Sequence, residues 1–170
     1  MKPWVIALCL CIFYFILPLQ YFVIGNDFGG GIQGALFRYQ MTPRGNSLIP
    51  ITSEMTYVTS GLYQGRTAFS VGFWVLGTSI LTILTTLSLI FWNWLSSQHI
   101  RIIILGMAGA GICYLLSCGF QYGLFLSGPA GTSLPIGVIL MIIFSVFIYS
   151  YQYLFRSSVE NSTQINNYEQ

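Results

Sequence analysis

Few residues of this chain could take part in chemistry, and their spacing limits what they could do. The cysteines Cys9, Cys11, Cys113 and Cys118 form a Cys-x-Cys and a Cys-x4-Cys pair inside apolar runs. Thiols buried in apolar surroundings stay protonated and unreactive, so these pairs favour helix packing over redox catalysis. The single histidine, His99, has no second histidine or carboxylate near it in the sequence. We therefore expect no enzyme activity, no metal site and no cofactor.

A glycine-rich segment formally matches a nucleotide-binding pattern. Gly29, Gly31 and Gly34 satisfy G-x-G-x-x-G. A dinucleotide loop needs a strand before it and a helix after it within a βαβ unit. Here an apolar run precedes the glycines and a proline-interrupted polar segment follows. The sequence therefore favours a flexible hinge over a cofactor site.

A stripe of small and weakly polar residues marks one helical segment. Its members recur at i, i+4, i+7, i+11 and i+15, which is one face of a helix: Gly106, Ala110, Cys113, Ser117 and Gln121. Small residues let helix backbones approach closely in lipid. We interpret this face as a helix-packing seam.

A second helical segment carries a hydroxyl-rich face. Its threonines are Thr78, Thr82, Thr85 and Thr86. Helix–helix contact, with hydroxyls bonding to carbonyls of the preceding turn, is the favoured interpretation. A polar pore lining is the alternative.

Composition places the chain in a membrane. Of its 170 residues, 55% are hydrophobic and only 6% are charged, whereas about 25% are charged in a typical soluble domain. The net charge of +2 is too small to indicate a nucleic-acid partner. Four uncharged stretches are long enough to span a bilayer, over residues 4–25, 67–92, 102–126 and 134–155.

These stretches predict an all-α membrane protein, a four-transmembrane-helix bundle forming one domain over residues 1–156. The competing interpretation of its first stretch is a signal peptide, but no small-residue cleavage site follows. The extracytoplasmic loop 26–66 is expected to be small and to contain a β-hairpin around 42–45, with a third strand over 54–59. The polar tail 157–170 is expected to be disordered.

The basic residues suggest an orientation. An even number of spans puts both termini on one side. The other side then holds three basic residues in the longer loop, Arg38, Arg44 and Arg66, and the side of the termini holds three in short segments beside spans, Lys2, Arg101 and Arg156. The positive-inside rule weighs such residues most heavily. We therefore expect both termini in the cytoplasm of a cell-membrane protein and loop 26–66 outside.

The layout of a helix, a long outer loop and three closely connected helices resembles the claudin and peripheral-myelin type of four-helix protein. Ser60-Gly61-Leu62-Tyr63, and Arg66 before the second stretch, are similar to that group's outer loop. That family pairs Gly-Leu-Trp with two loop cysteines, and loop 26–66 has neither Trp nor Cys. The resemblance therefore implies an architecture and no residue roles.

These features predict a non-enzymatic membrane protein. It would be a structural, adhesion or accessory subunit that associates through its helices, as a homo-oligomer or with other membrane subunits, and presents loop 26–66. The alternative is an oligomeric channel or transport subunit for a neutral solute, because no ionisable residue lies inside the predicted spans.

Overall fold

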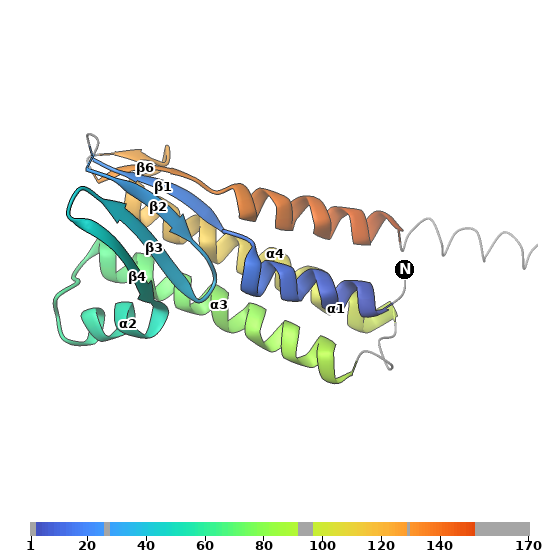
Figure 1. Cartoon of the computed structure of the whole chain (residues 1–170). Coiled ribbons are helices and arrows are strands. Elements are labelled where there is room, and N and C mark those ends of the chain that lie inside the picture. The colour runs from blue at the N-terminus through green and yellow to red at the C-terminus, as the bar shows by residue number, and fades with distance from the viewer. Residues whose placement is uncertain (1–2, 26–27, 92–96, 129, 152–170) are drawn as a thin grey trace, which may run out of the picture.

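The computed structural model describes residues 3–25, 28–91, 97–128 and 130–151. Its helices are α1 (Pro3–Cys11), continued by the π-helix η1 (Ile12–Ile16), α2 (Ile51–Thr59), α3 (Arg66–Ile90), α4 (Ser97–Tyr122) and an apolar helix over Ile136–Tyr151. Its strands are β1 (Gln20–Ile24), β2 (Gly30–Gln33), β3 (Phe37–Thr42), β4 (Gly45–Pro50), β5 (Ser127–Gly128) and β6 (Gly131–Leu134). The sheet lies at one end of the molecule, and the long helices run away from it side by side (Figure 1).

The predicted all-α four-helix bundle is wrong, because the chain is a mixed α/β protein. Six strands form one antiparallel sheet in the order β4-β3-β2-β1-β6-β5. The second hairpin, β5–β6, joins the first four strands by pairing with β1, for example Phe22 with Ser133. The segment between the last two apolar stretches of the sequence therefore supplies β5 and β6, which complete a sheet whose other strands lie roughly 80 to 110 residues earlier.

The prediction of a membrane-spanning helix over residues 4–25 is also wrong, because its final part, Gln20–Ile24, is the strand β1. The helical segment ends at Ile16, and Leu17 just before Pro18 is extended (φ −75°, ψ 124°), as the residue before a proline prefers. From Gln20 the chain enters β1, where alternate side chains, Gln20 and Phe22, are buried. Apolar content alone did not distinguish this half-buried strand from the end of a helix.

The segment after β4 is a helix where the sequence predicted a strand. β3 and β4 pair around the turn at 42–45, and Pro50 then stands at the N-cap of α2. Proline suits a helix start because its missing N–H is not needed there. Glu54, in the first turn of α2, is fully buried. The residues after Glu54 favour a strand by type, but this packing makes the segment helical.

The four-helix, multi-pass membrane description is likewise not supported. Among the described residues, two helices are long and apolar enough to cross a membrane, over Arg66–Ile90 and His99–Tyr122. Trp4–Ile16 and Ile136–Tyr151 are shorter apolar helices. Length and composition alone fit both a membrane span and a core helix of a soluble α/β protein, so they do not separate the two.

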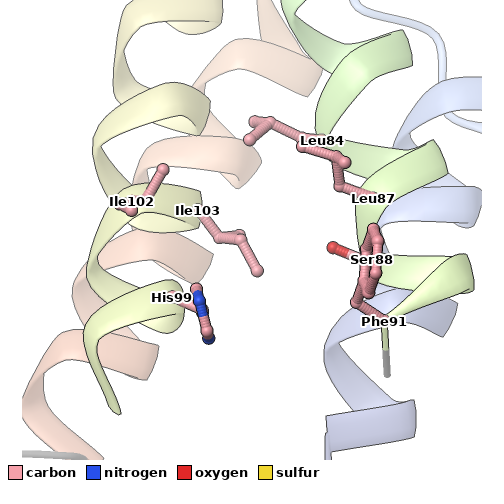
Figure 2. Close-up of a pocket in the computed structure, with 7 residues that line it drawn as sticks. All are labelled: Leu84, Leu87, Ser88, Phe91, His99, Ile102 and Ile103. Atoms are coloured by element: carbon pink, nitrogen blue, oxygen red, sulfur yellow. The ribbon is translucent and has the colours of Figure 1, made fainter. Parts of the chain in front are cut away.

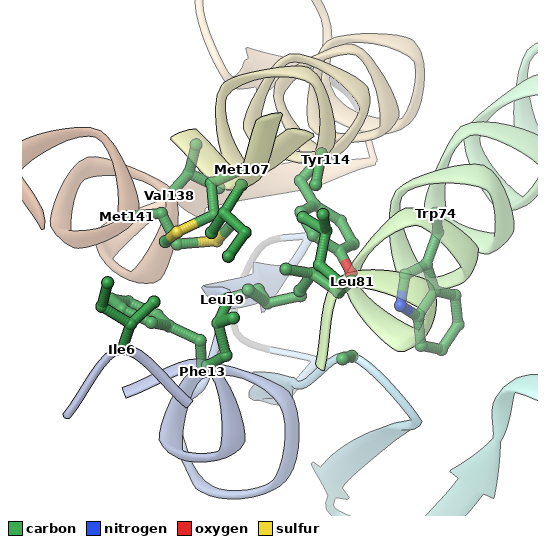
Figure 3. Packing of buried hydrophobic residues seen from close by; sticks show 14 residues of the cluster. Ile6, Phe13, Leu19, Trp74, Leu81, Met107, Tyr114, Val138 and Met141 are labelled. Carbon is green, nitrogen blue, oxygen red and sulfur yellow. The ribbon is translucent and has the colours of Figure 1, made fainter. Parts of the chain in front are cut away.

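The apolar core runs along the inside of the helices and up to the sheet. Figure 3 shows side chains from the first helical segment, α3, α4 and the last helix converging on Leu19, which lies between η1 and β1. Other members of this cluster include Ile6, Phe13, Trp74, Leu81, Met107, Tyr114, Val138 and Met141. The core therefore joins the helices to each other and to the base of the sheet.

Candidate functional site

The most unusual feature of the structure is a buried polar cluster where the sheet meets α3 and α4. We call it the polar junction, and it consists of Gln20, Gln33, Arg38, Glu54, Ser70, Ser117, Cys118, Gln121 and Ser133. All of these except Gln121 are at least nine-tenths buried. Buried polar and charged groups destabilise a fold unless they are paired, so their partners decide what the junction can do.

Arg38 of β3 connects more elements than any other residue of the junction. Its Nη2 donates to Gln33 Oε1 at 2.8 Å and to Gln121 Oε1 at 3.0 Å, and its Nε donates to Gln33 Oε1 at 3.1 Å. The guanidinium carbon also lies 5.4 Å from the centroid of the Trp74 ring. One side chain thus links β2, β3, α3 and α4, which is possible because guanidinium has five donors and a flat face.

The charge of Arg38 is balanced by Glu54 of α2. Arg38 Nη1 lies 3.2 Å from Glu54 Oε1, and the two side chains are 6% and 0% exposed. The pair is close but poorly aligned, and neither Glu54 oxygen accepts a well-formed hydrogen bond from a described residue. The ion pair is therefore electrostatic in character. Removing either partner would leave a buried charge unpaired.

Tyr63, after α2, lies near this ion pair. Partial burial and the negative charge of Glu54 raise the pKa of the Tyr63 phenol. Its ring also packs edge-on against Tyr57, with centroids 5.5 Å apart. Glu54 thus ties the short helix α2 to β3, and the contact between the two tyrosines holds the segment after α2 against that helix.

Serine residues hold α3 and α4 together at this end. Ser70 Oγ donates to the Ser117 carbonyl at 2.8 Å, and Ser117 Oγ donates to the Ser70 carbonyl at 2.8 Å. The two hydroxyl oxygens are 3.1 Å apart. Such reciprocal bonds require close backbones, which small residues permit.

A second part of the junction joins β1, β2 and β6 to α4. Gln20 of β1 donates to Gln33 Oε1 at 2.6 Å, and its own Oε1 accepts from Ser133 Oγ at 3.0 Å and from the Cys118 thiol. The space between Gln20, Gln33 and Cys118 is too small for a water molecule. This part of the junction therefore has no room for a substrate.

The five residues of the predicted helix-packing seam lie on the side of α4 that faces α3, within the same chain. A Cβ on Gly106 would come within 2.8 Å of Leu84 Cδ1 on α3. Ala110 is fully buried, and Cys113 lies beside Gly77 of α3. Ser117 and Gln121 belong to the polar junction. The seam is thus occupied by α3.

The predicted threonine face is divided among several surroundings. Thr78 Oγ1 donates to the Ala35 carbonyl at 2.8 Å and lies 3.2 Å from Tyr114 Oη. Thr82 Oγ1 donates to the Thr78 carbonyl at 2.8 Å and is 3.0 Å from Tyr14 Oη. Thr85 is buried without a hydrogen-bond partner among the described residues, and Thr86 is exposed.

The central glycine of the G-x-G-x-x-G match serves strand packing. Gly31 lies in β2, opposite Phe22 of β1 and Gln40 of β3. A Cβ there would collide with the Tyr39 carbonyl oxygen and come within 2.9 Å of the Phe22 ring. Glycine is needed because two neighbouring strands approach it closely, and the segment is a strand where the sequence suggested a hinge.

Sequence reasoning missed the polar junction. Arg38 lies in the predicted loop 26–66 and Gln20 in the predicted span 4–25, and no local pattern assigns either residue to a site. A signal was present, because Arg38 interrupts an apolar and aromatic run with a charge, and Glu54 is one of only four acidic residues. Pairing the two required knowing that the fold brings Glu54 of α2 to Arg38 of β3.

Other predictions fall partly or wholly outside the site. His99 lies at the end of the molecule opposite the sheet, beside a cavity between α3 and α4. The described residues contain no group of three or more His, Cys, Asp or Glu that could hold a metal ion. Lys2, Arg156 and the tail 157–170 lie outside the described residues.

No protein-family model, curated protein or solved structure with which the chain was compared matches it.

Proposed function

We propose that this chain is a non-enzymatic integral membrane protein, a structural, adhesion or accessory subunit that crosses the bilayer with α3 and α4. In this proposal the sheet and α2 stand on the outer surface, where they contact a partner protein. The polar junction holds the sheet and α2 in a fixed position on the ends of the two helices. Its hydrogen bonds are used within the chain, which supports a structural rather than a catalytic role.

The observation that carries the membrane placement is the exposure of the two apolar helices. Only 39% of the most apolar 18-residue window of each helix is buried inside the chain. Large aliphatic side chains stay exposed along both, among them Leu76, Ile83, Ile90, Leu105 and Ile112. A soluble monomer rarely exposes such a long apolar surface, whereas lipid covers it without loss of stability.

Two observations support the proposed orientation. α1 begins, and the helix Ile136–Tyr151 finishes, at the end of the molecule away from the sheet (Figure 1). Arg101, near the start of α4, lies at that end too, and two further basic residues flank the first and last apolar segments in the sequence. On the side of the sheet, Arg38 is neutralised by an ion pair inside the junction, which leaves Arg44 and Arg66. The positive-inside rule then favours cytoplasmic termini and an external sheet.

The outer surface offers an open strand edge to a partner. β4 is the edge strand next to β3, and Leu48 within it is 63% exposed. An open edge presents unpaired backbone groups that another strand can use. Contact through β4 would let a partner chain bind without any change in the helices.

Labelling with a membrane-impermeant maleimide tests the placement. In a full-length chain whose native cysteines are alanine, Asn46→Cys on β4 should be labelled in intact cells, and His99→Cys in the first turn of α4, an exposed position, only after permeabilisation. A chain that stays in the soluble fraction would contradict the membrane placement. Labelling of His99→Cys but not Asn46→Cys in intact cells would reverse the orientation.

A pull-down in mild detergent tests the partner. The tagged full-length chain should co-purify with a membrane protein in fixed stoichiometry. Leu48→Lys on β4 should release that protein, while Leu124→Lys, which alters another exposed leucine at the sheet end (95% exposed), should retain it. Purification of the native chain as a monomer without a partner would count against the proposal.

The channel alternative gains no support from the described residues. The hydroxyls of Thr78 and Thr82 bond within the chain, so they do not line an open path in this arrangement. The alternative remains a prediction from the sequence, to be tested by flux measurements on a reconstituted Thr82→Val variant.

A further inference from the structure

An apolar cavity separates α3 and α4 at the end of the molecule opposite the sheet. Its volume is about 370 Å³, within the range of small-molecule sites. Leu84 and Leu87 of α3 and Phe91 just after it form one wall, and Ile102 and Ile103 of α4 form the other (Figure 2). The cavity lies far from the polar junction and from the β4 edge, so it is independent of the function proposed above.

One polar group in this wall has no partner among the described residues. Ser88 is 1% exposed, and its Oγ makes no hydrogen bond with any of them. Figure 2 shows this oxygen pointing from α3 into the space between the helices, toward the side where Ile103 and His99 lie. A serine inside a helix can bond to the carbonyl of the preceding turn. Leaving the hydroxyl buried and unpaired costs free energy, so its direction calls for an acceptor in the cavity.

We propose that this cavity binds a single acyl chain that ends in a carbonyl oxygen. The hydrocarbon chain lies against the aliphatic walls, and the carbonyl oxygen accepts the hydrogen bond of Ser88. The ligand class is a single-chain lipid, such as a free fatty acid or a monoacylglycerol. Binding is non-covalent and involves no reaction.

The size and chemistry of the cavity exclude bulkier occupants. A helix with its side chains is about 10–12 Å across, too wide for a space bounded by two neighbouring helices of this volume. A pure hydrocarbon would fill the walls but leave Ser88 unpaired, and a strongly polar solute would find only Ser88 and His99 among five apolar side chains. An acyl chain with a carbonyl end matches both parts of the lining.

Photolabelling of the purified full-length chain in detergent tests the site. The probes are palmitic acid and monopalmitoylglycerol, each with a diazirine on the chain. We expect saturable labelling that maps to residues 84–91 and 99–103 and that unlabelled palmitic acid displaces better than hexadecane does. The probe that saturates at lower concentration identifies the free acid or the ester as the source of the carbonyl.

Two matched variants separate the cavity from general lipid contact. Ile102→Trp should fill the mouth of the cavity and abolish saturable labelling. Ile112→Trp, which changes an isoleucine of similar exposure on the same helix (58% against 60%) outside the cavity, should leave it unchanged. Ser88→Ala removes only a hydroxyl that has no partner among the described residues, so the fold should persist while affinity falls roughly three- to tenfold, the worth of one hydrogen bond.

Several results would overturn the proposal. Labelling spread evenly along the exposed faces of α3 and α4, or equal loss in Ile102→Trp and Ile112→Trp, would show that no site exists. Equal displacement by palmitic acid and hexadecane, together with unchanged affinity in Ser88→Ala, would remove the carbonyl contact with Ser88.

Discussion

The two ends of the α3–α4 pair are built in opposite ways. Near the sheet, Ser70 and Ser117 bond reciprocally across the helices, and Arg38 reaches α4 through Gln121. At the far end, aliphatic side chains border a cavity of about 370 Å³, and Ser88 has no partner among the described residues. At the sheet end the two helices are thus joined by direct hydrogen bonds. At the other end their apolar side chains leave a cavity between them.

This difference shows what directional bonds add to apolar packing. Hydrogen bonds fix distances between elements, because each fails if its partners move by about an ångström. Apolar contacts tolerate a range of separations and leave space where side chains do not fit. The sheet end should therefore be rigid and sensitive to substitution, and the far end tolerant and able to accept a ligand.

The largest effect is expected from breaking the ion pair at the sheet end. Arg38→Met leaves the buried Glu54 carboxylate without a cation, which should lower the free energy of unfolding by about 3–5 kcal/mol. Arg44→Met alters an exposed arginine of the same hairpin and should change it by less than about 0.5 kcal/mol. Chemical denaturation in detergent measures both.

The double variant Arg38→Met/Glu54→Leu sharpens this test. Removing both charges should restore a large part of the lost stability, because no unpaired charge remains. Equal stability of Arg38→Met and Arg44→Met would mean that the ion pair does not hold α2 and the sheet together.

The same glycine substitution should have unequal effects at the two ends. At the sheet end, a Cβ on Gly137 would collide with the Pro18 carbonyl oxygen and lie 2.7 Å from Leu19 Cα. Gly137→Ala should therefore cost about 2–3 kcal/mol, since backbone must shift. At the far end, a Cβ on Gly106 meets only the tip of the Leu84 side chain, 2.8 Å away.

Leu84 lines the cavity and can move into it. Gly106→Ala should therefore change stability by less than about 1 kcal/mol, because the gain in helix propensity offsets the adjustment. Thermal unfolding of the two variants side by side checks the difference. Equal destabilisation would show that the far end is as tightly packed as the sheet end.

A threonine-to-valine pair should give effects of opposite sign. Thr78→Val removes the bond to the Ala35 carbonyl and should destabilise the chain by about 1–3 kcal/mol. Thr85→Val removes a buried hydroxyl without a partner among the described residues and should stabilise it by about 1 kcal/mol. Denaturant midpoints decide; a loss of stability in both variants would refute the assignment of Thr85 as unpaired.

The smallest expected effect is a pH dependence near α2. The pKa of Tyr63 is raised in the folded chain by burial and by Glu54, so the unfolded chain loses this proton first as pH rises. The stability contributed by neutral Tyr63 is complete below about pH 10 and is lost as pH rises through the folded pKa. Tyr63→Phe should make stability fall less steeply above pH 10, and an unchanged slope would contradict this.

The sequence predicted the two long helices and missed the sheet for a physical reason. Residues 67–92 and 102–126 were recognised because an uncharged apolar run of more than about 20 residues is too long for a strand and fits a helix, and α3 and α4 lie there. At β1 the sequence predicts the end of a membrane span, because its residues, Gln20–Ile24, are mostly apolar and continue the apolar run before Pro18. Its partners β2 and β6 are determined by long-range pairing that a local pattern does not contain.

The candidate site could be predicted only in part. The positions of Ser117 and Gln121 on one helix face follow from their spacing, and both belong to the polar junction. Their partners Arg38 and Ser70 lie 83 and 47 residues away in the chain, so no spacing rule connects them. The cavity and the unpaired hydroxyl of Ser88 could not be predicted either, because both depend on how the side chains of α3 and α4 pack against each other.

Disulfide cross-linking tests the contrast between the two ends most directly. The test uses membranes containing the full-length chain with its native cysteines replaced by alanine. The double variant Ser70→Cys/Ser117→Cys should form a disulfide rapidly, since the hydroxyl oxygens of the two serines are 3.1 Å apart. Leu87→Cys/Ile102→Cys, placed on opposite walls of the cavity (Figure 2), should stay reduced under the same conditions. Equal cross-linking of both pairs, or none in the first pair, would contradict a helix pair that is closed at the sheet and open at the other end.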